Sequence, residues 1–183
     1  MRALHPDVME ILLDEEKIAE IVENMGRQIS EDYKGKNLLL VSVLKGSLVF
    51  MADLMRQITV PCAIDFLSVS SYGSGTTTSG EVRILKDLDA SLEGKDVLVV
   101  EDILDSGVTL SYLLNNLSAR NPASIRLCTF LDKPERRRVD IKADYIGASV
   151  PDEFIVGYGL DYAEHYRNLP YVGILKPSVY TKE

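Results

Sequence analysis

The sequence has few of the residues from which zinc sites and disulfides are built. Only two cysteines, Cys62 and Cys128, and two histidines, His5 and His165, occur in 183 residues. A structural zinc site takes about four cysteine or histidine ligands, in pairs at short spacing. Both cysteines stand among apolar, strand-like residues, where reduced cysteines usually lie. The chain is therefore predicted to contain neither a zinc site nor a disulfide.

Long apolar runs and an excess of basic residues are also missing. The longest apolar runs, such as residues 38–41, have only a few members, far fewer than the roughly 20 that cross a bilayer. No signal peptide pattern opens the chain, so we expect a cytoplasmic location and no membrane partner. The formal net charge is −8, which argues against nucleic acid as a partner, because phosphate backbones are bound by clustered Lys and Arg.

Length and pattern predict one α/β domain over residues 1–183, large enough for a sizeable core. Apolar, strand-like runs alternate with amphipathic helical patterns in the central half of the chain. The predicted strands are residues 38–44, 61–69, 97–100, 124–131, 144–150, 154–157 and 171–175, and the predicted helices start at about residues 15, 48 and 108. Such alternation is typical of a mostly parallel, twisted sheet flanked by helices.

One stretch combines a buried strand, acids and a small-residue turn. The apolar run 97–100 leads into Glu101 and Asp102, and Ser106 and Gly107 precede the predicted helix. Free N–H groups and the helix dipole at such a helix start can bind phosphate, while the acids can bind sugar hydroxyls and Mg²⁺. The alternative is a strand that ends in surface acids, with a capped helix after it. Neither a P-loop nor a complete G-x-G-x-x-G pattern occurs.

Other polar residues stand at the ends of predicted strands. Lys45 follows the strand at 38–44, and Lys133 follows the strand at 124–131. Ligands of open α/β sheets bind beyond the carboxyl ends of the strands, so we expect these lysines to lie near Glu101 and Asp105. Residues 70–80 are nearly all Gly, Ser and Thr; a loop this long is predicted to close over a site, although a plain hairpin connection is the alternative.

The run from residue 97 to Thr109 resembles the phosphoribosyl diphosphate signature of the type I phosphoribosyltransferases. Four more segments occur in the order typical of the hypoxanthine-guanine phosphoribosyltransferases, and the resemblance covers roughly residues 38–175. The segments are Leu44-Lys45-Gly46, Ser71-Tyr72-Gly73, Leu131-Asp132-Lys133, and Phe154 to Tyr162 followed by Arg167. One departure is Ser47, where some relatives carry a second glycine.

The resemblance implies the type I phosphoribosyltransferase fold, with a small hood formed by the chain ends. It also implies an enzyme of purine salvage. Such an enzyme transfers 5-phosphoribose from phosphoribosyl diphosphate to hypoxanthine and/or guanine, giving IMP or GMP and pyrophosphate, through an oxocarbenium-like state. Mg²⁺ is the implied cofactor, and a homo-oligomer, dimer or tetramer, is the implied assembly.

For the sugar phosphate, the resemblance assigns ribose hydroxyls and Mg²⁺ to Glu101 and Asp102. It assigns a second Mg²⁺, near the purine, to Asp161. The 5'-phosphate cradle is Asp105, Ser106, Gly107, Val108 and Thr109, with Ile103 beside it, and the pyrophosphate grip is Lys45, Gly46 and Arg167. Arg suits the last role because it makes bidentate phosphate contacts.

For the base, Asp105 is the implied catalytic residue, a general acid/base at N7 of the purine. Lys133 would donate to the 6-oxo group, which selects oxopurines over adenine, because an amino group would face it with donors only. Phe154 would stack on the base, Ile155 would contact its edge, and Ser71 and Tyr72 would close over the reacting centre and exclude water.

Two alternatives stay open. The first is a regulator on the same fold that senses phosphoribosyl diphosphate and binds nucleic acid, for which a basic face is missing. The second is a phosphoribosyltransferase for another base. The Lys133 and 154–161 segments argue against adenine and pyrimidines, but xanthine is not excluded, because backbone groups can make the contacts at position 2.

Overall fold

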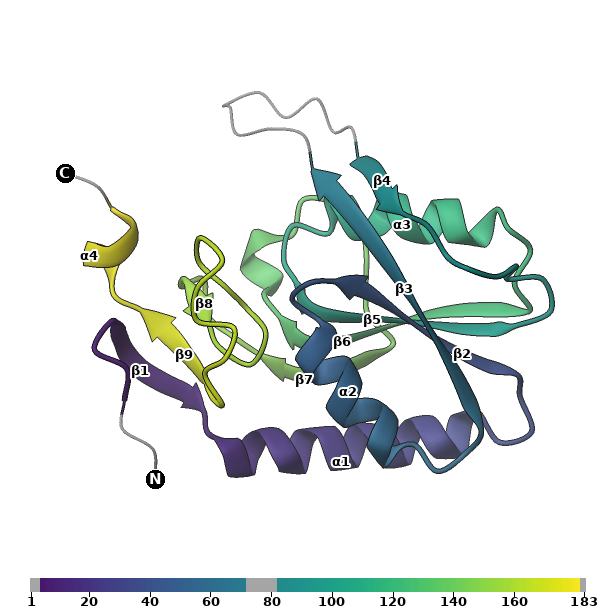
Figure 1. Ribbon diagram of the computed structural model, residues 1–183, viewed down its shortest axis with the longest axis horizontal. Helices are drawn as coiled ribbons and strands as arrows, with labels where there is room; N and C mark the ends of the chain where they lie inside the picture. The colour runs from purple at the N-terminus through teal and green to yellow at the C-terminus, as the bar shows by residue number, and fades with distance from the viewer. Residues whose placement is uncertain (1–3, 72–81, 182–183) are drawn as a thin grey trace.

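The computed structural model describes residues 4–71 and 82–181, which form a large central sheet and a smaller hood (Figure 1). The six strands of the central sheet lie in the order β4-β3-β2-β5-β6-β7. Their bounds are β2 (Leu38–Leu44), β3 (Cys62–Ser71), β4 (Val82–Lys86), β5 (Asp96–Leu104), β6 (Ser124–Asp132) and β7 (Tyr145–Ser149). All neighbours pair in parallel except β3 and β4, which form a hairpin. The predicted mostly parallel sheet is confirmed.

Helices cover both faces of this sheet. The helices α1 (Glu15–Asp32) and α2 (Leu48–Gln57) pack on one face, and α3 (Val108–Ser118) packs on the other. Asp14 caps α1 by accepting the N–H of Lys17 at 2.8 Å. The apolar stripe of α1 is buried as its spacing predicts, and each such side chain contributes about 1.5–3 kcal/mol to stability.

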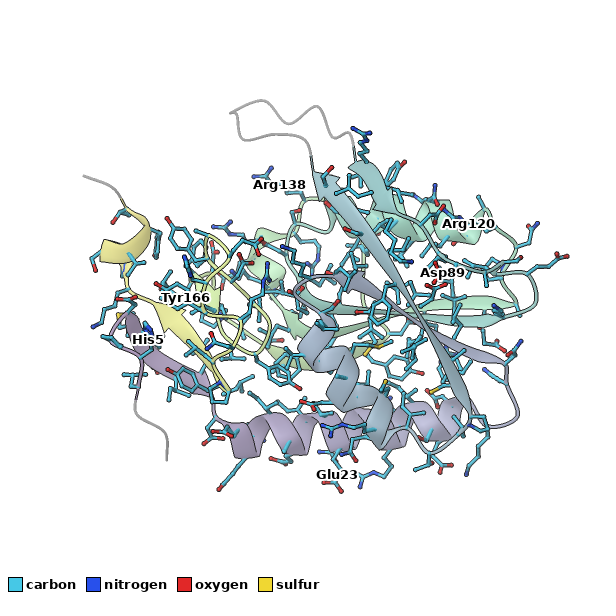
Figure 2. All side chains as sticks on the ribbon, in the orientation of Figure 1. His5, Glu23, Asp89, Arg120, Arg138 and Tyr166 are labelled. Carbon is cyan, nitrogen blue, oxygen red and sulfur yellow. The ribbon has the colours of Figure 1, made fainter. Side chains whose placement is uncertain are left out.

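The hood is a three-stranded sheet in the order β1-β9-β8, made largely from the two chain ends. Its elements are β1 (Val8–Leu13), β8 (Ile155–Val156), β9 (Val172–Leu175) and the short C-terminal helix α4 (Pro177–Tyr180). Figure 2 labels His5 and Tyr166 here, and their rings meet edge-on with centroids 5.3 Å apart. The expected hood is confirmed, although β1 and α4 were not predicted as elements.

The strand before the acidic motif is longer than its apolar run. β5 continues past Val100 to Leu104, because Glu101 pairs with Thr129 and Ile103 with Leu131 of β6. Glu101 and Asp102 are therefore part of the sheet rather than of the following loop, and their positions are fixed by the ladder. No helix in the described ranges is long and apolar enough to cross a membrane.

Candidate active site

Two adjoining cavities open at the carboxyl end of the central sheet. The loop cavity has a volume of about 250 Å³ and is lined by Val43, Glu101, Ile103, Asp105, Ser106, Gly107, Thr109, Leu110 and Leu113. The hood cavity has a volume of about 270 Å³ and is lined by Ile103, Asp105, Lys133, Arg136, Asp152, Glu153, Phe154, Ile155, Leu160, Asp161 and Tyr180. Ile103 and Asp105 line both, so the two cavities lie next to each other.

The wall of the loop cavity includes the start of α3. Gly107 precedes this helix with φ of 80°, a left-handed conformation that favours glycine. A Cβ there would also overlap the side chain of Ile141. Gly107, the N-cap residue, makes no side-chain cap. Within the described residues, the N–H of Val108 donates a long hydrogen bond of 3.4 Å to Ser106 Oγ. The remaining N–H groups and the helix dipole are available for an anion.

Glu101 and Asp102 place two carboxylates beside this anion site. Burial, reinforced by the charge of Asp102, raises the pKa of Glu101 well above its usual value. Burial also raises the pKa of Asp102, although the N–H of Ile103, donated at 2.7 Å, opposes that shift. Within the described residues, Glu101 Oε1 is buried without a hydrogen-bond partner. A cation or a donor from a ligand would relieve this cost.

The acids present fit Mg²⁺ rather than a metal held by protein ligands alone. Among the residues that the structure describes, no group of three His, Cys, Asp or Glu side chains could hold a metal ion. Mg²⁺ is commonly bound by one or two carboxylates, substrate oxygens and water. The orphaned oxygen of Glu101 and the neighbouring Asp102 match that donor set.

The Lys45–Gly46 turn lies directly beside Asp102. A Cβ on Gly46 would overlap the Asp102 carboxylate, and a Cβ on Gly159 would overlap the carbonyl of Gly46. Ser42 of β2 and Ser47, which follows the turn, are both fully buried. Their hydroxyls form a hydrogen bond of 2.7 Å that links the two ends of the turn. The backbone of Gly46 thus lies against both the Asp102 carboxylate and the backbone of Gly159, and each contact leaves room only for glycine.

The cations predicted for pyrophosphate are paired with acids here. Lys45 Nζ lies 3.0 Å from Glu164, and Arg167 lies 2.9 Å from Asp161 and 3.5 Å from Glu164. Arg167 also donates to the carbonyl of Gly159 at 2.8 Å. The exposed Lys45–Glu164 pair is weak, so an incoming anion can replace it at little cost.

Asp105 and Lys133 meet in the hood cavity. Lys133 is only 6% exposed, and its Nζ donates to the carbonyl of Glu153 at 2.8 Å. Burial lowers the pKa of Lys133, and the charge of Asp105 opposes that shift. Within the described residues, Asp105 Oδ1 is buried without a partner. The cavity therefore offers one donor and one acceptor to a planar ligand.

Phe154 supplies the aromatic wall of the hood cavity. Its backbone carbonyl accepts the N–H of Leu175 at 2.8 Å, which fixes it at the end of β9. The following residue, Ile155, is buried in β8. Asp161 lies beyond them, where its Oδ2 accepts the N–H of Glu164 at 2.9 Å. Phe154, Ile155 and Asp161 thus line the same cavity as Asp105 and Lys133.

Not every predicted residue can be placed. Val108 and Thr109 form the first turn of α3, and Ser71 ends β3. Tyr72 and the rest of the segment predicted to close over the site, up to residue 80, lie outside the described residues. A third cavity of about 460 Å³, between α1, α2 and residues 158–170, includes Arg167 but none of the other predicted site residues. The loop and hood cavities therefore contain most of the predicted site residues, whereas Lys45, Gly46 and Asp102 line none of the three cavities.

Sequence reasoning missed several residues that shape these cavities. Arg137 donates to the backbone carbonyls of Leu104 and Asp105 and pairs with Asp132, so it fixes the turn that carries Asp105. Arg136 and Asp152 pair at 2.6 Å on the wall of the hood cavity. No local motif marks these arginines, since their roles depend on the Pro134–Arg136 turn folding back over β5.

A parallel sheet with an uncapped helix start, paired acids and an aromatic wall at one rim defines an α/β protein for a phosphorylated ligand that carries a planar group. Comparison with known families agrees, since the phosphoribosyl transferase domain matches residues 8–163. A hypoxanthine-guanine phosphoribosyltransferase from Staphylococcus epidermidis is 54% identical over 179 residues, which cover 98% of this chain and 100% of that relative. The chain belongs to the hypoxanthine-guanine branch of the phosphoribosyltransferase family.

Two further relatives differ in length: one matches this chain over nearly its whole length, and the other is much longer. A crystal structure of a hypoxanthine phosphoribosyltransferase from Staphylococcus aureus matches with a TM-score of 0.95 and 53% identity, covering 97% of each chain. The bifunctional protein TilS/HprT of Listeria monocytogenes is 53% identical over 180 residues, 98% of this chain, but the chain spans only 28% of that protein's length. The resemblance found in the sequence is confirmed.

Proposed function

We propose that this protein transfers 5-phosphoribose from phosphoribosyl diphosphate to hypoxanthine and/or guanine, giving IMP or GMP and pyrophosphate in purine salvage. The observation that carries the proposal is the pair of adjoining cavities that share Asp105 and Ile103. One cavity has the features of a sugar phosphate site, and the other has those of a base site. The names of the full-length relatives support the same activity.

In the hood cavity, Phe154 stacks on the base and Lys133 donates to the 6-oxo oxygen. The hydrogen bond to the Glu153 carbonyl holds the ammonium of Lys133 in place. The remaining protons of the ammonium are then available to a ligand. Asp105, whose Oδ1 has no partner among the described residues, accepts the proton at N7 while N9 attacks the anomeric carbon. An adenine amino group would meet the ammonium of Lys133 donor to donor, which costs affinity.

In the loop cavity, the turn of Ser106, Gly107 and Thr109 binds the 5'-phosphate, and Glu101 and Asp102 accept hydrogen bonds from the ribose hydroxyls. The same two acids would hold one Mg²⁺, and Asp161 would hold a second through water. When bound, Mg²⁺ neutralises the charge of the diphosphate leaving group. Lys45 and Arg167 bind the pyrophosphate after exchanging their acidic partners, Glu164 and Asp161, for phosphate oxygens.

One assay tests the proposal. The protein is incubated with phosphoribosyl diphosphate, Mg²⁺ and one base at a time, and the nucleotide is identified by mass spectrometry. We expect IMP from hypoxanthine or GMP from guanine, and none from adenine or uracil. The residues of the site neither favour nor exclude xanthine as a substrate, so xanthine is included in the assay. Absence of any nucleotide, together with a salt-dependent shift on DNA or RNA, would favour the regulator.

Three further predictions accompany the proposed function. We infer that residues 1–183 act as a single domain, that the protein forms a homo-oligomer, and that it is located in the cytoplasm. The acidic net charge of −8 supports the absence of a nucleic-acid partner. Sedimentation at several protein concentrations tests the assembly.

A further inference from the structure

The C-terminal helix α4 holds Tyr180 against the hood cavity. The N–H of Lys176 donates to the carbonyl of Asp7 at 2.8 Å, and Lys176 Nζ donates to the carbonyl of Pro6 at 2.5 Å. The N–H of Thr181 then closes the turn on Pro177 at 2.9 Å. The contacts of Lys176 tie the start of α4 to the N-terminal segment, and the bond from Thr181 closes the single turn of the helix. The position of Tyr180 therefore follows from the hood rather than from a free chain end.

Tyr180 stacks on one face of Phe154, the ring that is predicted to bind the base. The ring centroids of Tyr180 and Phe154 are 4.9 Å apart with 29° between the planes, a stacked pair. Tyr162 meets Phe154 edge-on, with centroids 5.3 Å apart and an angle of 88°. An aromatic ring has two faces, so Tyr180 covers one and leaves the other for a planar ligand.

Tyr180 also belongs to the same cavity wall as Asp105 and Lys133. Its ring is partly buried and packs with the apolar core of the hood. Removing it would open the back of Phe154 to water and would free that ring to turn. A stacking surface that can turn binds a planar base less tightly, because binding must then also order the ring.

We propose that Tyr180 is a positioning residue for base binding, which holds Phe154 as the outer layer of a three-layer stack of Tyr180, Phe154 and the purine. The proposal rests on the proposed function, since it needs a purine in the hood cavity. The matched phosphoribosyl transferase domain ends at residue 163, so this role falls on a segment outside it. The chain end thereby sets the affinity for the base without touching the sugar phosphate.

The test compares a ligand that has the base with one that lacks it. Binding of GMP and of ribose 5-phosphate is measured by isothermal titration calorimetry for the wild type, Tyr180→Ala, Tyr180→Phe and Tyr180→Leu. Ser178→Ala is the matched control, because Ser178 is an exposed residue of the same helix. Thermal unfolding of each variant shows whether the fold is kept, and Tyr180→Leu fills the space if alanine loosens α4.

In Tyr180→Ala we expect the Kd of GMP to rise about 5- to 10-fold, the range of one aromatic pair. The Kd of ribose 5-phosphate should stay unchanged, Tyr180→Leu should be intermediate, and Tyr180→Phe and Ser178→Ala should match the wild type. In turnover, the KM of the base should rise while the KM of phosphoribosyl diphosphate stays constant.

Two results would overturn the stack and can be told apart from failure of the proposed function. If the wild type prefers GMP over ribose 5-phosphate but Tyr180→Ala binds GMP equally well or more tightly, the stack is wrong and the proposed function stands. Tighter binding would mean that Tyr180 occupies the place of the base. If the wild type binds both ligands equally, the proposed function fails, and the stack fails with it.

Discussion

The loop cavity and the hood cavity adjoin each other but differ in how far apart in the sequence their lining residues lie. Apart from Val43, every residue that lines the loop cavity lies between residues 101 and 113, on one strand, one turn and one helix. The hood cavity collects residues from four separate segments, including the C-terminal helix. Local chain geometry is therefore enough to build an anion site, whereas the base site forms only when the whole fold is in place.

Metal removal should give the largest effect, and it tests the loop side. Glu101 and Asp102 are partly buried acids, and the only cation whose charge acts on either pKa within the described residues is Arg167, which lowers that of Asp102. The diphosphate therefore needs Mg²⁺ to bind next to them. We expect nucleotide formation to be abolished in excess chelator and restored by added MgCl₂. Full turnover in excess chelator would refute the metal assignment, and with it the charge balance proposed for this cavity.

This loop side is also the part that could be predicted from sequence. The apolar run before Glu101 and the small residues before Val108 predicted a strand, a turn and a helix, and these are present. Contiguous residues suffice because hydrogen bonds within one helix and one strand pairing fix their positions. Even here the strand end was placed too early, since pairing of Ile103 with Leu131 extends β5.

Apart from Lys133, whose place after a strand predicted it near Asp105, the hood side could be predicted only through the resemblance. Phe154 in isolation reads as a core aromatic, and Tyr180 has no periodic pattern around it because α4 is a single turn. Its place depends on β9 pairing with both β1 and β8, contacts between residues far apart in sequence. Arg137 was missed for the same reason, since its partners lie on β5 and β6.

Asp105→Asn tests the catalytic role of a residue that lines both cavities. We expect kcat to fall roughly a hundred-fold or more, as for a lost general acid/base group, while binding of phosphoribosyl diphosphate is largely kept. Asp89→Asn is the matched control, because Asp89 is an exposed carboxylate that lines neither cavity. Steady-state kinetics with varied phosphoribosyl diphosphate separates the two effects. Unchanged turnover in Asp105→Asn would remove this residue from the catalytic role.

Lys133→Ala tests the hood side alone. We expect the KM of hypoxanthine and guanine to rise about 10- to 100-fold, the loss of a charge-assisted hydrogen bond of about 1.5–3 kcal/mol. Binding of ribose 5-phosphate should be unchanged. A parallel loss of ribose 5-phosphate binding would contradict the separation of the two cavities, and equal use of adenine by the wild type would contradict the selectivity argument.

The pH profile provides a second measurement of Lys133. Burial lowers the pKa of its ammonium below the usual 10.5, so the proton is lost at a lower pH than from an exposed lysine. Only the protonated form donates strongly to the 6-oxo oxygen, and the KM of the base should therefore rise on the alkaline side, starting below that value. Lys133→Arg should shift this rise to higher pH, because guanidinium stays protonated.

The smallest effect is expected beneath the Lys45–Gly46 turn, at the buried pair of Ser42 and Ser47. Ser47→Gly removes one hydroxyl and leaves Ser42 Oγ without the partner at 2.7 Å, which costs about 1–3 kcal/mol and lowers Tm by roughly 2–4 °C per kcal/mol. The KM of phosphoribosyl diphosphate should rise only about 2- to 5-fold, since the side chain of Lys45 and the backbone donors remain.

A double variant separates the lost hydrogen bond from a general loosening of the turn. Because replacing both partners of a buried hydrogen bond costs less than orphaning one, Ser42→Ala with Ser47→Ala should be more stable than the sum of the single changes predicts. Thermal unfolding and the KM of phosphoribosyl diphosphate are measured for each variant. Strict additivity would show that the two serines act independently, and a changed KM for the base would mean that the loop side and the hood side are coupled through this turn.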